Sequence, residues 1–89
     1  MTISKRVVYR GRVQGVGFRY AAQRIAEGFA VAGYVKNLPD GAVELVAEGL
    51  TDAVDRYLAA VAGRMAPYIE HKSEAEISPE GFEQFQVRY

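Results

Sequence analysis

The chain has 89 residues, enough for one domain (residues 1–89) that buries about 60% of its unfolded surface. Eleven basic and eleven acidic side chains leave no net charge to attract nucleic acid, so any anion must be recognised at a local site. The absence of cysteine excludes disulfides, thiolate catalysis and zinc–thiolate centres. Because the N-terminus lacks the apolar core of a signal peptide and no run reaches the ~18 apolar residues of a membrane span, we expect a cytoplasmic protein without membrane contacts.

The first predicted element is a strand over residues 5–13, which alternates apolar and polar side chains. Val7, Tyr9 and Val13 would face the core, and the intervening arginines would face solvent. A basic outer face is compatible with nucleic-acid binding, but arginines also keep an exposed strand face solvated. No pair of aromatic residues lies between these arginines to stack on bases, so we favour the second interpretation.

Residues 18–29 repeat their apolar positions at helical spacing, which predicts a helix. The chain must therefore reverse its direction sharply between the strand and this helix. Gly15 and Gly17 bracket this reversal, and glycine adopts positive φ at little cost. Backbone N–H groups would converge there with the positive end of the helix dipole, and Arg19 would add a fork of donors suited to a phosphoryl group. The bare pattern also occurs in simple turns. The dinucleotide fingerprint is excluded, because it needs a third glycine where Tyr20 stands.

The middle of the chain predicts a hairpin. Residues 33–38 and 42–48 have strand character, and Leu38-Pro39-Asp40-Gly41 between them supplies turn residues. In the second strand the apolar positions would face the core and the alternating positions would face solvent, the latter being Glu44, Val46 and Glu48. This alternation predicts a sheet with one covered face.

The last third of the chain predicts a second helix and two strands. Thr51 is a suitable N-cap and Gly63 a suitable end for the helix. Residues 70–74 are all charged or polar and indicate a short edge strand, and residues 85–89 alternate as a final strand. The order predicts an α+β, two-layer ferredoxin-like sandwich (βαββαβ), with an antiparallel sheet and two helices on one face.

Two segments carry a resemblance to a known family. Residues 11–19 (GRVQGVGFR) closely resemble the signature of the acylphosphatase family, and residues 33–44 (GYVKNLPDGAVE) resemble that family's second signature. The resemblance is good from Val7 to Leu58 and is weaker beyond it. Tyr34 stands where the family usually has tryptophan, and the usual pattern is largely lost over residues 64–78.

The resemblance implies a function and a set of site residues. It implies hydrolysis of small acyl phosphates to a carboxylate and inorganic phosphate, without a cofactor or metal, by a monomer. Arg19 and Asn37 match the catalytic arginine and asparagine of the family. The residues that match its phosphate-binding loop are Gln14, Gly15, Val16, Gly17, Phe18 and Arg19.

The residue types fit that chemistry. Phosphoryl transfer proceeds through a loose transition state, so catalysis consists largely of positioning and charge stabilisation. The Asn37 amide can hold a water in line with the breaking bond but cannot act as a base, so the leaving group must depart unprotonated, as a carboxylate does.

His71 lies in a polar segment and is better explained as a solvated side chain. Glu70, Glu74 and Glu76 lack the spacing of a cation loop, and we therefore expect no metal.

Two other functions are compatible with this sequence. A ferredoxin-like fold can serve as a non-catalytic module that binds anions or RNA, although such a module would not need a water-orienting amide. The chain could also be an acyl-phosphate-handling domain of a larger maturation enzyme, and its compact length argues against that.

Overall fold

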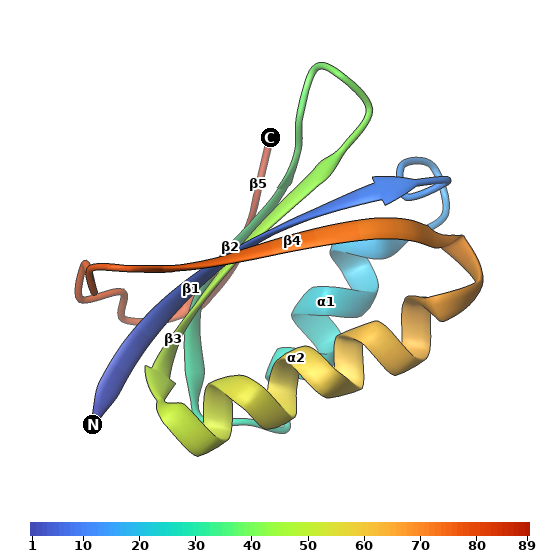
Figure 1. Cartoon of the computed structure of the whole chain (residues 1–89). Coiled ribbons are helices and arrows are strands. Elements are labelled where there is room, and N and C mark those ends of the chain that lie inside the picture. The colour runs from blue at the N-terminus through green and yellow to red at the C-terminus, as the bar shows by residue number, and fades with distance from the viewer.

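The computed structural model describes residues 1–89 and contains five strands, two α-helices and one short 3₁₀ helix. The sheet has the strand order β4-β1-β3-β2-β5, and both helices cover the same face (Figure 1). The predicted two-layer, ferredoxin-like α+β fold is therefore confirmed. No helix is both long enough and apolar enough to cross a membrane. The elements are β1 (Thr2–Gly11), α1 (Phe18–Ala26), β2 (Val31–Asn37), β3 (Val43–Leu50), α2 (Thr51–Met65), η1 (Ala66–Tyr68), β4 (Ile69–Ile77) and β5 (Phe85–Arg88).

The sheet is mixed, whereas the sequence analysis predicted an antiparallel one. Strands β4, β1, β3 and β2 pair antiparallel, but β5 pairs parallel with β2. The reason is the path of the loop over residues 78–84, which takes the chain from the β4 edge to the opposite edge of the sheet. The strand after that loop runs opposite to β4, and this is the direction of β2.

Both helix ends differ from prediction. Helix α1 ends at Ala26 instead of Phe29, and the chain leaves it through short-range bonds such as Phe29 N–H to Ala26 O (3.1 Å). Neither Gly28 nor Ala30 has a positive φ, so no left-handed cap is used. Helix α2 continues past Gly63 to Met65, whose side chain is buried and extends the apolar stripe by one turn. Its N-cap is Leu50, where Thr51 was expected.

The core lies between the sheet and the two helices. Its largest fully buried side chains are Tyr9, Tyr57 and Phe18, and the rings of Tyr9 and Phe18 lie 4.9 Å apart. The Tyr57 hydroxyl donates to the carbonyl of Ala22 in α1 at 2.8 Å. Because a buried hydroxyl without a partner is costly, this bond fixes α2 against α1.

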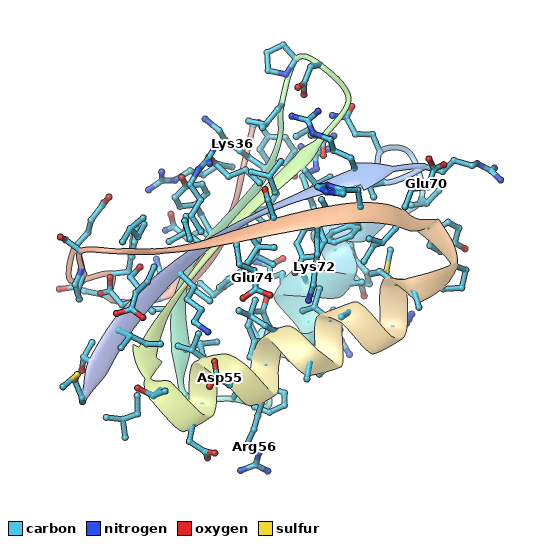
Figure 2. All side chains as sticks on the ribbon, in the orientation of Figure 1. Lys36, Asp55, Arg56, Glu70, Lys72 and Glu74 are labelled. Carbon is cyan, nitrogen blue, oxygen red and sulfur yellow. The ribbon has the colours of Figure 1, made fainter.

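Strand β4 is at the edge of the sheet, as predicted, but its nine residues contradict the prediction that it is short. It pairs with β1 along most of its length. Two of its charged side chains are also paired, because Glu74 contacts Lys5 (3.9 Å) and Lys72 (3.2 Å), and Lys5 contacts Asp55 of α2 (2.9 Å). Figure 2 shows Lys72 and Glu74 pointing from β4 towards α2. Charges on this edge oppose pairing with another sheet.

The face of the sheet away from the helices is partly covered, which corrects the predicted exposure of Glu44, Val46 and Glu48. All three are buried, with Glu44 only 7% and Glu48 only 6% exposed. Arg6 Nε and the Tyr34 hydroxyl donate to Glu44 at 2.6 and 2.8 Å. Glu48 accepts three backbone N–H groups of the 78–84 loop, at 2.7, 2.8 and 3.0 Å. The alternation of the strand was predicted correctly, but it gives no sign of the partners that these side chains find on other segments.

Candidate active site

The loop between β1 and α1 is built on two glycines in the left-handed region. Gly15 has φ 78° and Gly17 has φ 79°, as the predicted reversal requires. Gly17 is the N-cap of α1, and the first helical bond runs from the Ala21 N–H to the Gly17 carbonyl. The N–H groups of the first turn have no helical partner, no side chain caps them, and no acidic residue lies beside them. Such a terminus favours an anion.

Arg19 and Asn37 line one pocket of about 240 Å³ together with this loop. Arg19 lies in the first turn of α1, and Asn37 is the last residue of β2. Figure 1 shows why they meet: the loop after β1 and the β2–β3 hairpin lie at the same end of the sheet. The complete lining is Val13, Gly15, Gly17, Phe18, Arg19, Tyr20, Gln23, Asn37, Val87 and Tyr89.

Two polar side chains that line the pocket, those of Arg19 and Asn37, are free. Arg19 and Asn37 are half-buried, and neither makes a side-chain hydrogen bond or an ion pair within the chain. The Cζ of the guanidinium lies over the ring of Tyr89, 4.8 Å from the ring centroid. Since the charge of Arg19 is not neutralised by a carboxylate, it is available to an anionic ligand.

No histidine, aspartate or glutamate side chain lines the pocket. His71 is exposed on β4, outside the pocket. Nowhere in the chain do three histidine, aspartate or glutamate side chains gather as metal ligands would. The pocket can therefore bind and orient an anion and a water, but it offers no histidine, aspartate or glutamate side chain to act as a general base.

Carboxylates near the site are held in their charged form by partners outside the pocket. In the hairpin turn, hydrogen bonds from Arg10 and from the backbone of Ala42 lower the pKa of Asp40. Burial alone would raise the pKa of Glu44, but the bonds from Tyr34 and Arg6 outweigh it and the pKa is lowered. Burial and the bond to Glu44 raise the pKa of Tyr34 to about 12.

The structure places most of the predicted site residues together. Gly15, Gly17, Phe18, Arg19 and Asn37 all line the pocket. Two others do not, and each has another structural role. The Gln14 amide donates to the carbonyls of Leu38 and Ala42 in the hairpin, and Val16 packs against the core.

Several lining residues were not predicted from the sequence. Gln23 follows Arg19 by four positions on α1, a spacing that puts both on one helix face and could have identified it. Val87 and Tyr89 come from the end of the chain, and only the parallel pairing of β5 with β2 brings them here. No local pattern predicts that pairing.

Fold and site together define a small α+β protein in which a glycine loop, a helix N-terminus and a free arginine face an asparagine across one pocket. Residues 5–87 match the family model described as Acylphosphatase. An acylphosphatase of Thermotoga maritima is 46% identical over 80 residues, which are 89% of each chain. The crystal structure of acylphosphatase from Bacillus subtilis covers both chains completely, with a TM-score of 0.88 and 38% identity. The chain belongs to the acylphosphatase family and is an enzyme of that family.

The same fold also forms a small part of a longer protein. The crystal structure of T. kodakarensis HypF matches all of this chain with a TM-score of 0.80 and 32% identity, while the matched part is only 12% of that protein.

Proposed function

We propose that this acylphosphatase hydrolyses small acyl phosphates by attack of water on phosphorus, with Arg19 and Asn37 as its catalytic residues. The observation that supports this most is the meeting of both side chains, each free of other partners, in one pocket with the unpaired N–H groups of the α1 N-terminus. The pocket's modest volume of about 240 Å³ fits a small substrate.

The phosphoryl group binds in the loop over residues 14–19. Backbone N–H groups between Gly15 and Arg19 donate to its equatorial oxygens, and the guanidinium adds two parallel bonds. These donors are fixed before the substrate arrives, so they stabilise the charge that develops on the oxygens without reorganising. Gln14 contributes to this loop through its backbone, because its side-chain N–H groups are bound to the hairpin.

The Asn37 amide holds the attacking water on the side opposite the leaving group. The water oxygen bonds to phosphorus as the phosphorus–oxygen bond to the acyl group breaks, and the electron pair of that bond leaves with the carboxylate. The proton of the water passes to a phosphate oxygen. Because a carboxylate departs without protonation, this step requires no general acid and no metal.

A non-catalytic nucleic-acid module is the weaker alternative. On the outer face of β1, Arg6 is paired with Glu44 at 2.6 Å and Arg10 with Asp40 at 2.9 Å, so both charges are partly neutralised. A protein that binds a phosphate backbone needs free cations there. The absence of nucleic-acid partners, a monomeric state and a cytoplasmic location belong to the same proposal.

The test is hydrolysis of benzoyl phosphate in the presence of a chelator. We expect turnover by the wild type, and a loss of at least about a hundredfold in kcat/KM for Arg19→Ala and for Asn37→Ala, typical for removal of a transition-state donor. Arg19→Lys should also lose most activity, because a point charge cannot replace the planar fork. Arg24→Ala is the matched control, since Arg24 is an exposed arginine of the same helix outside the pocket. Wild-type rates in both the Arg19→Ala and Asn37→Ala variants would refute the proposal.

A further inference from the structure

The side chain of Gln14 connects the phosphate loop to the hairpin that carries Asn37. Its Nε2 donates to the Leu38 carbonyl at 2.8 Å and to the Ala42 carbonyl at 2.9 Å. Leu38 directly follows Asn37, and Ala42 directly precedes β3. One amide group therefore donates a hydrogen bond to each side of the turn, immediately beyond the proposed water-holding residue Asn37.

These bonds are not needed to close the turn. The Ala42 carbonyl already accepts the Leu38 N–H at 2.8 Å, and the Leu38 carbonyl already accepts the Gly41 N–H at 3.1 Å. Gln14 uses the second lone pair of each carbonyl. Its bonds consequently contribute little to the hairpin itself, and their effect is to fix the hairpin against the loop over residues 12–17.

The hairpin tip has few other polar supports. The pairing of β1 with β3 ends at Tyr9 and Val43, so beyond this point no neighbouring strand holds the turn on that side. The remaining tie is the ion pair of Arg10 with Asp40, in which both side chains are 53% exposed. Exposed pairs of this kind contribute little. The half-buried Gln14 bonds are thus the main link between the two halves of the site.

We propose that Gln14 is a positioning residue, which sets the distance between Asn37 and the phosphate cradle of Arg19. This inference rests on the proposed function, because it assigns Asn37 the attacking water. Phosphate binding does not depend on the link, since the loop N–H groups and Arg19 remain where α1 places them. The rate of attack does depend on it, because a displacement of about 1 Å can lower a rate about a hundredfold.

The test separates turnover from phosphate binding. In Gln14→Ala we expect kcat for benzoyl phosphate to fall about ten- to a hundredfold, with the inhibition constant of inorganic phosphate unchanged within about threefold. Gln14→Glu keeps the shape of the side chain but removes both donors and places an oxygen opposite two carbonyls, so it should lose at least as much. Arg10→Ala, which cuts the exposed tie to the same hairpin, is the control and should keep wild-type kcat. Thermal melting of each variant verifies its fold.

A double-mutant cycle decides whether Gln14 acts through Asn37. If it does, Gln14→Ala should change kcat by less than about twofold when Asn37 is already alanine, because residues that act as a unit are not additive. The inference is overturned by full additivity, by wild-type kcat in both Gln14 variants, or by a weakened phosphate affinity at unchanged kcat, which would make Gln14 a phosphate ligand. Failure of the proposed function is a separate outcome. It would be seen as wild-type activity in the single variants Arg19→Ala and Asn37→Ala.

Discussion

Replacing Glu48 by glutamine should destabilise the protein, although the residue lies far from the active site. Its carboxylate is 6% exposed and accepts the N–H groups of Glu80, Gly81 and Phe82 at 2.7, 2.8 and 3.0 Å. These bonds fasten the 78–84 loop across the face of the sheet opposite the helices. They also set the point from which β5 begins.

The expected magnitude follows from the arrangement of the bonds. The bond to Glu80 ends on one carboxylate oxygen and the other two bonds end on the second. A glutamine can keep two of them as neutral bonds, while its NH₂ group faces the third N–H. Charged bonds contribute about 1.5–3 kcal/mol each and neutral ones about half as much, so replacing three charged bonds by two neutral ones should lower the free energy of unfolding by at least about 3 kcal/mol.

Urea unfolding and thermal melting measure this loss. For a domain of this size, a change of about 3 kcal/mol lowers Tm by roughly 12–24 °C. Glu83→Gln is the matched control, because Glu83 is exposed in the same loop and its side chain accepts no hydrogen bond. Equal unfolding midpoints for the two variants would refute the reasoning, since they would mean that water serves the loop N–H groups as well as Glu48 does.

Two further changes probe the loop and the covered face of the sheet. Gly17→Ala meets no atom within 4 Å but forces alanine to φ 79°, so we expect about 1–2 kcal/mol of strain and weaker inhibition by phosphate; wild-type values for both would contradict this. Glu44→Gln should cost about 1–2 kcal/mol at pH 7, because it removes a charged acceptor from Arg6 and Tyr34. The folded state lowers the pKa of Glu44 from 4.5, so this stabilisation exists above that value and disappears as the pH falls through the lowered pKa. The urea midpoints of wild type and Glu44→Gln should therefore differ at neutral pH and converge at acid pH. A difference that stays constant with pH would contradict a stabilisation by the charge of Glu44.

The features predicted correctly from sequence are those with a local physical cause. Gly15 and Gly17 adopt the positive φ that the reversal between strand and helix demands, and the turn after Asn37 lies where Pro39 and Asp40 indicated it. The alternation of β3 assigned its two faces correctly. These results depend on backbone sterics and side-chain periodicity, which a single sequence contains.

The features that were missed depend on contacts between distant segments. The direction of β5 and the bonds that bury Glu48 both follow from where the 78–84 loop crosses the sheet, and Glu44 is covered by partners on two other strands, Arg6 and Tyr34. The bonds of Gln14 to the hairpin join positions 24 and 28 residues away, and a glutamine inside a phosphate-loop motif gives no sign of them. For the same reason, the contribution of Tyr89 to the pocket was not visible in the final strand.

The most direct test of water attack on phosphorus is to hydrolyse benzoyl phosphate with the wild-type enzyme in ¹⁸O-labelled water and to analyse both products by mass spectrometry. Attack by a water held at Asn37 on a phosphoryl group held at Arg19 predicts that the label enters inorganic phosphate and that the benzoate stays unlabelled. Label in the benzoate would show that water attacks the carbonyl carbon, and it would contradict the roles assigned to both residues.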